Sequence, residues 1–244
     1  MHNENNLIIS KIKDKIKIFE KTNKINSTNF LEPVELAIVK SVLKEIPHTI
    51  FGGIEDSERN IIIIGTEDIQ DFSTFISILE IESNFNLNHR DILGSILGLG
   101  IKRDIIGDII INQNKANVFI IPEMQNYIIQ NLQKIGKEKV NVKSISFNEI
   151  IKPAENFKEF ITTVASCRLD AIISSAFGIS RELSSKLVEN DKVKLNYISV
   201  TNSSKKISQD DLISVRGYGR IILKSVIGET RKDRVKVEFR VFKN

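Results

Sequence analysis

The sequence predicts an α+β protein made of an N-terminal α/β segment over residues 1–70, a central βαββαβ domain over 71–150, a linker over 151–163 and a C-terminal domain over 164–244. Three observations predict this organisation. Apolar residues recur at helical spacing near the N-terminus, strand and helix patterns alternate in the middle of the chain, and basic residues gather in its last third. A chain of 244 residues is long enough for each part to bury a core.

The N-terminal segment is predicted to contain two helices and a hairpin. Apolar residues at three- and four-residue steps indicate a helix over 7–21, and a second helix is predicted over 30–46, with Pro33 in its first turn and Pro47 after its end. The stretches 48–51 and 60–66 are apolar and bounded by turn residues, which is typical of paired strands.

The central part alternates between the two periodicities. Strands are predicted at 75–81, 107–113, 115–122 and 139–147, and helices at 89–100 and 123–136. This order forms an antiparallel sheet backed by two helices, the plan shared by ferredoxin-like and RNA-recognition-motif domains. Phe75 and Phe119 are the candidates for stacking bases on such a sheet, with an ordinary core role as the alternative.

The first central helix and the turn after it carry candidate RNA contacts as well as glycines. His89, Arg90, Lys102 and Arg103 are the candidate RNA-binding residues, and a solvated surface is the alternative. Gly94, Gly98 and Gly100 are expected to permit close packing and a tight turn, because GSILGLG matches neither dinucleotide- nor phosphate-binding loops.

The C-terminal part starts with two helices. Leu169, Ile172, Ile173 and Ala176 predict a helix that Gly178 ends in a left-handed conformation. Ser180 is the predicted N-cap of the next helix, which is expected to bury Leu183, Leu187 and Val188. A turn at Asn190 and Asp191 leads into an alternating strand over 192–200, and strand-like runs follow over 210–226 and 230–242.

The charge distribution favours a polyanion partner for this part. Residues 164–244 hold 16 Lys and Arg against 9 Asp and Glu, whereas the first 163 residues hold 19 against 22. Arg168 and Arg181 lie near helix starts, where guanidinium and free backbone N–H groups suit phosphates. The predicted RNA-binding residues are Arg168, Arg181, Lys186, Lys192, Lys194, Asn196, Lys205, Arg216, Arg220, Arg231 and Lys232.

Several classes of site lack support in the sequence. No run reaches the roughly 18 apolar residues of a membrane span, the N-terminus lacks a secretion signal, and the single Cys167 fits a reducing cytoplasm. The three histidines are far apart, so neither a metal nor a cofactor is expected. His89-Arg90-Asp91 lacks the metal-binding Asn of a kinase loop, since residue 96 is Ile.

The triplet Arg168-Leu169-Asp170 imitates an RNA-modifying active site. Too few residues follow Asp170 to build a pseudouridine synthase, so the triplet is expected to serve helix-start electrostatics and to orient Arg168. No catalytic residue is predicted. The sequence therefore favours a non-enzymatic RNA-binding factor. Two alternatives remain: an RNA-modifying enzyme whose catalytic part is the first 163 residues, and a protein-binding adaptor.

The last third also resembles a known RNA-binding domain. RLDAIISSAFGISRELSSKLVENDKVKLN followed by DDLISVRGYGR is similar, over residues 166–224, to the small domain named after ribosomal small-subunit protein four, the S-four-type domain. Two positions differ from the usual pattern. Asp191 and Tyr197 stand where the domain ordinarily has glycine. Asp visits left-handed conformations more readily than most residues, whereas Tyr197 changes what projects beside Asn196.

The rest of the chain resembles the bacterial YlmH family of ribosome-associated proteins. FLEP at 30–33, HRDILGSILGLGIKRDIIGDI at 89–109, GYGR at 217–220 and TRKDRVKVE at 230–238 carry this resemblance, which covers almost the whole length. It implies a partner in the large ribosomal subunit, through rRNA and tRNA or peptidyl-tRNA, and other quality-control factors. The implied role is ribosome-associated quality control of stalled translation, in which alanine tails are added without a template.

Overall fold

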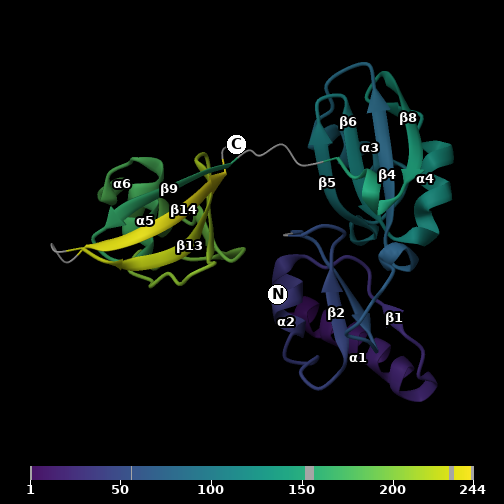
Figure 1. Cartoon of the computed structure of the whole chain (residues 1–244), viewed down its shortest axis with the longest axis horizontal. Coiled ribbons are helices and arrows are strands. Elements are labelled where there is room, and N and C mark those ends of the chain that lie inside the picture. Colours follow the sequence, from purple (N-terminus) through teal and green to yellow (C-terminus); the bar gives the residue numbers. More distant parts are fainter. Residues whose placement is uncertain (1, 56, 152–156, 231–233, 243–244) are drawn as a thin grey trace. The chain divides into compact units, whose positions relative to one another are not determined.

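The computed structural model describes residues 2–55, 57–151, 157–230 and 234–242, with side chains from residue 6 onward. The chain is an α+β protein that divides into two compact units, Met1–Ala154 and Glu155–Asn244 (Figure 1). In the described residues the strands form three sheets, and neighbouring strands within each sheet are antiparallel.

The first unit begins with a small sheet covered by helices. Helices α1 (His2–Thr22) and α2 (Pro33–Val39) pack on a sheet of order β1-β3-β2, formed by Asn26–Ser27, Ile61–Ile64 and His48–Phe51. The hairpin of β2 and β3 was predicted, and it pairs His48 with Ile64. Helix α2 is shorter than predicted, because after Val39 the chain forms single turns, as in the bond from the Ile46 N–H to the Leu43 carbonyl.

Strand β3 is entirely apolar because it separates two cores. Ile62 and Ile64 pack with the helices of the small sheet, while Ile61 and Ile63 face the other way and pack against the central sheet. The predicted loop before β3 is attached to that sheet too. Arg59 donates from Nε to the Ile106 carbonyl (3.0 Å) and is paired with Glu32 at 2.9 Å. The N-terminal segment and the central sheet therefore share one unit.

The central sheet has the order β5-β6-β4-β8-β7. Its elements follow in the predicted βαββαβ order, with a short extra strand β7 before the last: β4 (Ser77–Ser83), α3 (His89–Gly98), β5 (Ile106–Asn112), β6 (Lys115–Ile120), α4 (Gln125–Asn131), β7 (Lys134–Ile135) and β8 (Glu138–Ile145). Helices α3 and α4 pack on one face of the sheet through an apolar cluster that includes Ile92, Ile128 and Val118.

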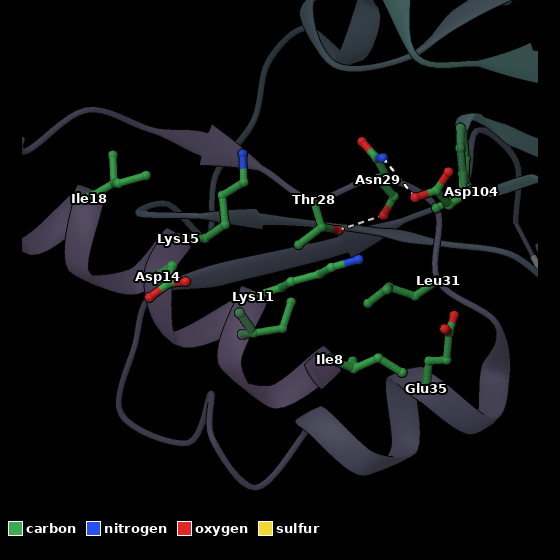
Figure 2. Close-up of a pocket in the computed structure, with 12 residues that line it drawn as sticks. Ile8, Lys11, Asp14, Lys15, Ile18, Thr28, Asn29, Leu31, Glu35 and Asp104 are labelled. Carbon is green, nitrogen blue, oxygen red and sulfur yellow. Dashed lines mark hydrogen bonds between the residues drawn. The ribbon is translucent and has the colours of Figure 1, made fainter. Parts of the chain in front are cut away.

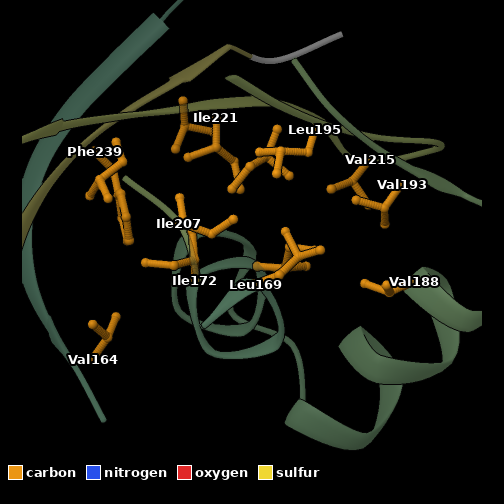
Figure 3. Packing of buried hydrophobic residues seen from close by; sticks show 14 of the residues in the cluster. Val164, Leu169, Ile172, Val188, Val193, Leu195, Ile207, Val215, Ile221 and Phe239 are labelled. Carbon is orange, nitrogen blue, oxygen red and sulfur yellow. The ribbon is translucent and has the colours of Figure 1, made fainter. Parts of the chain in front are cut away.

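The second unit is a six-stranded sheet with two helices on one face. The sheet has the order β11-β10-β12-β13-β14-β9 and consists of Ile198–Ser199, Val193–Leu195, Leu212–Val215, Gly219–Glu229, Val235–Phe242 and Phe157–Val164. Helices α5 (Leu169–Phe177) and α6 (Arg181–Glu189) cover its inner face. Figure 3 shows Leu169, Ile172 and Val188 directed at sheet residues such as Val193 and Ile221.

Three predictions for this unit need correction. The predicted strand over 192–200 is a hairpin, because the chain turns at Asn196 and Tyr197 and β11 pairs antiparallel with β10. The predicted linker over 151–163 is too long, because residues 157–163 belong to strand β9. This strand pairs along its whole length with β14, from the pair Val164–Val235 to the pair Phe157–Phe242. Residues 152–156 lie outside the described residues. Leu183 is 39% exposed rather than buried, and Ser184 takes the inward position in α6. The predicted ends of the helices are correct, since Gly178 adopts φ +65° and the Ser180 hydroxyl accepts from the Leu183 N–H.

Candidate nucleic-acid interface

The two helix starts of the second unit are joined by one buried carboxylate. The Asp170 side chain is 5% exposed and accepts from Arg181 at 2.8 Å and from Arg168 Nε at 3.2 Å. It also accepts from the Ala171 N–H at 2.9 Å. The two arginine side chains remain 42% and 50% exposed. Asp170 therefore fixes two guanidinium groups side by side at the surface, which fits the predicted orienting role.

The charge state of Asp170 follows from these contacts. Burial raises the pKa of the carboxyl, but the hydrogen bonds from Arg181, Arg168 and the Ala171 N–H and the charge of Arg181 outweigh it, so the pKa is lowered from its ordinary value. Asp170 is therefore ionised and fully engaged at neutral pH. A carboxylate held in this way orients cations, and a general acid or base would need a free proton site.

The basic loop over residues 203–206 is hydrogen-bonded to the start of α5. The Leu169 and Asp170 N–H groups donate to the carbonyls of Lys205 and Ser203, and Arg168 donates to the Ser204 hydroxyl at 2.6 Å. The expectation of free N–H groups at the start of α5 is therefore wrong, because the loop already binds them. Lys205 and Lys206 are exposed in this loop, and Lys206 forms a backbone bridge with Arg168.

Four further candidate RNA-binding residues lie in the last turn of α6 and on or beside strands β10 and β12. Lys192 and Arg216 are exposed and adjacent, because the Arg216 N–H donates to the Lys192 carbonyl at 2.9 Å. Lys194 is exposed on β10. Lys186 is paired with Glu182 at 2.7 Å, so its charge is largely offset locally. Lys192, Lys194 and Arg216 are therefore exposed basic side chains of the sheet region, separate from the arginine pair at the two helix starts.

Asn196 has a role within the fold. Its side chain donates to Asp211 at 2.7 Å and accepts from the Leu212 N–H at 2.9 Å, at φ +48°. Both ends of the amide are therefore used to hold the turn after β10. Tyr197, at φ +68°, stands in the conformation that favours glycine, as the usual pattern of the domain predicts. Arg231 and Lys232 lie outside the described residues, and Arg220 is exposed on β13.

The candidate residues of the central domain separate into two groups. His89, Arg90 and Lys102 are exposed at or near the ends of α3. Desolvation lowers the pKa of His89 and the nearby Arg103 lowers it further, so the imidazole is mostly neutral at pH 7. Arg103 is half-buried and donates to the carbonyls of Ile106 and Gly107, so its guanidinium supports the fold.

Of the two candidate stacking residues, Phe119 is buried, whereas Phe75 precedes the sheet, because β4 begins at Ser77 and not at residue 75 as predicted. Phe119 is 0% exposed and packs with Phe30, Ile61 and Ile63 of the N-terminal segment, and Phe75 lies beside the same cluster. The sheet face on which RNA-recognition motifs stack bases is therefore covered there. The glycines of α3 also differ from expectation: no atom lies within 4 Å of a Cβ placed on Gly94 or Gly98, so neither permits close packing within the chain.

The first unit also contains a cavity that no sequence motif indicated. Figure 2 shows it between α1 and the stretch from Thr28 to Leu31, with Lys11 and Lys15 on the helix side and Asp104 at one end. Its volume is about 340 Å³, and Ile8, Ile12 and Phe30 supply apolar walls. None of the predicted RNA-binding residues lines it.

Two further properties concern membranes and metals. In the described part of the chain, no helix combines the length and apolar character that crossing a membrane requires. Among the same residues, no three His, Cys, Asp or Glu side chains are grouped so that they could hold a metal ion.

Comparison with known proteins places these features in a family. Residues 67–149 match the family described as "Putative RNA-binding domain in YlmH". The chain is 30% identical over 230 residues to "Ribosome-associated protein quality control protein P2" of Bacillus subtilis (strain 168), covering 91% of this chain and 90% of the relative. This chain belongs to the YlmH family. The solved structure "Cell division protein ylmH from Streptococcus pneumoniae" is 25% identical, with a TM-score of 0.55 over 61% of this chain and 95% of that one.

Sequence reasoning missed one member of the basic cluster of this YlmH-family protein. Lys206 pairs through its backbone with Arg168 in an isolated bridge, which puts it at the arginine pair. The signal was present in the sequence, since Lys205 and Lys206 are adjacent in NSSKK. Only the attachment of the loop to α5 shows that both belong to this surface.

Proposed function

We propose that this protein is a non-enzymatic factor that binds structured RNA through its second unit, as a domain of the S-four type. Its targets are the large ribosomal subunit, through rRNA, and tRNA or peptidyl-tRNA bound there in the cytoplasm. The process is ribosome-associated quality control of stalled translation with alanine tailing. The central domain, with its βαββαβ order, is an RNA-recognition-motif-like domain in architecture.

The observation that carries this proposal is the arginine pair on Asp170. Guanidinium groups bind phosphate oxygens in a fixed, bidentate geometry, and a buried carboxylate that orients two of them lowers the entropy lost on binding. Lys205 and Lys206 are exposed in the loop that is bonded to the start of α5, and Lys192 and Arg216 add basic charge elsewhere on the same unit. Such a surface suits the regularly spaced phosphates of folded RNA, and it reads little base sequence.

The name of the B. subtilis relative supports the ribosomal setting. That protein is named for ribosome-associated quality control, and this chain matches nine-tenths of it. Charge and orientation without a reactive group favour a binding role over catalysis, since the carboxylate at the centre of the site is held ionised by two arginines.

Ribosome binding by charge-reversal variants tests the proposal. Arg181→Glu and Lys205→Glu are expected to weaken binding to large subunits roughly tenfold or more at moderate salt, and to reduce the salt dependence by about one phosphate contact. Lys205→Glu leaves Asp170 undisturbed, so it separates a lost contact from a lost fold. Lys44→Glu, an exposed lysine of the first unit, is the matched control. Unchanged binding in both test variants would refute the interface.

A further inference from the structure

Among the residues that the structure describes in the second unit, no helix packs on the outer face of the six-stranded sheet. Cross-strand register aligns Lys194, Ser214, Arg220, Phe242 and Phe157 in one row across β10, β12, β13, β14 and β9. None of these residues belongs to the core under α5 and α6. With strands about 4.8 Å apart, the row extends over roughly 19 Å.

Aromatic rings and guanidinium groups meet at one end of this row. The rings of Phe157 and Phe242 form an edge-to-face pair with centroids 5.8 Å apart. The guanidinium carbon of Arg240 lies 4.6 Å from the Phe157 centroid, and that of Arg220 lies 5.8 Å from the Phe242 centroid. Both phenylalanines lie on the outer side of the sheet and are partly exposed.

The charges of this face favour an anion. Lys194 and Arg220 are exposed in the row, and Lys236 and Arg240 follow on β14. Two acidic residues of these strands have partners: Glu159 accepts from Arg240 at 2.7 Å, and Glu238 accepts from the Ser225 hydroxyl at 2.9 Å. Positive charge is therefore in excess beside the rings.

We propose that this face binds an unpaired stretch of RNA by base stacking. The stacking platform, defined as Phe157, Phe242, Arg220, Arg240 and Lys194, offers the two surfaces on which unpaired bases stack, aromatic rings and guanidinium planes, with a lysine for the backbone. The inference rests on the proposed function in that its ligand is also RNA. The platform, however, lies on the sheet face opposite to α5 and α6, and it recognises single strands.

The test uses the full chain and a short labelled oligouridine, which has no secondary structure. The double variant Phe157→Leu/Phe242→Leu keeps apolar side chains but removes the rings. It is expected to weaken oligouridine binding roughly tenfold, because stacking on aromatic side chains supplies much of the affinity for single strands. Phe160→Leu is the matched control: it changes the same residue type on the same strand, where the ring packs against the core residue Phe239.

Each outcome decides between the two sites. Weakened oligouridine binding in the double variant, with a thermal midpoint close to that of the wild type and with unchanged binding in Phe160→Leu, supports the platform. Unchanged binding in the folded double variant overturns it, while loss of ribosome binding in Lys205→Glu would still uphold the proposed function. If the double variant instead loses a co-purifying protein that resists ribonuclease, the face docks protein and the RNA proposal is wrong.

Discussion

At the scale of single residues, Asp170 connects stability to the proposed interface. Asp170→Asn is expected to lower the free energy of unfolding of the second unit by about 1–3 kcal/mol, because charge-assisted hydrogen bonds to half-exposed arginines are lost. Urea unfolding of both proteins measures this. RNA affinity is expected to fall as well, since the guanidinium groups lose their common anchor, and a variant with full affinity would contradict the orienting role.

The same carboxylate gives a pH dependence of defined sign. Because the pKa of Asp170 is lowered in the fold, its contribution to stability is present above the unfolded pKa and is lost as the pH falls through the lower, folded pKa. The wild type should therefore lose more stability than Asp170→Asn as the pH falls below about 4. Urea midpoints of both proteins between pH 3 and pH 7 test this, since that range includes the ordinary pKa of about 3.9. Parallel curves of midpoint against pH would contradict it.

Asn196 provides a second prediction at this scale. Asn196→Ala is expected to reduce stability by about 1–2 kcal/mol, since it removes two hydrogen bonds and leaves alanine at positive φ. RNA affinity of the folded variant should stay within about twofold of wild type, because the amide is already bound within the fold. Lys194→Ala, two residues earlier, should show the reverse pattern, with weaker binding and little change in unfolding.

At the scale of elements, two glycines with open surroundings should respond in opposite ways. A Cβ on Gly94 or on Gly178 meets no atom within 4 Å, but Gly178 has φ +65° whereas Gly94 lies inside α3 without a left-handed φ. Gly94→Ala should stabilise the first unit by about 0.5–1 kcal/mol, and Gly178→Ala should destabilise the second by about 1–2 kcal/mol. Thermal unfolding compares them, and the same sign for both would contradict the helix ends described above.

Some helix boundaries could be predicted from the sequence, whereas others could not. Ser180 and Gly178 act through local hydrogen bonds and local φ, so sequence spacing was enough to place them. Helix α2 ends seven residues earlier than its apolar spacing indicated, because single turns bury Leu43 equally well. Leu183 was placed on the wrong side of α6 since periodicity cannot distinguish neighbouring positions on the rim of a buried face.

At the scale of the whole molecule, the second unit has a core of its own. Among the described residues, its buried cluster is formed by residues from Val164 onward, and the edge strand β9 consists of residues that were predicted to be a linker. A fragment that starts at Phe157 should therefore fold alone and keep binding to structured RNA. Circular dichroism and RNA titration test this, and a fragment that starts at Val164 is the control, because it lacks β9. Equal stability of the two fragments would contradict the role of the strand.

The sequence by itself determined the α+β class, the βαββαβ order of the central part, the two helices of the C-terminal part with the residues at their starts, and the basic surplus of the last third. These depend on periodicity, caps and composition, which are local properties. Only the tertiary structure decided that Phe119 is core, that Arg103 and Asn196 are used by the fold, that 157–163 is a strand and that Lys206 joins the arginine pair. Each of these depends on a partner distant in the sequence, because burial and cross-strand pairing arise only when separate segments pack together.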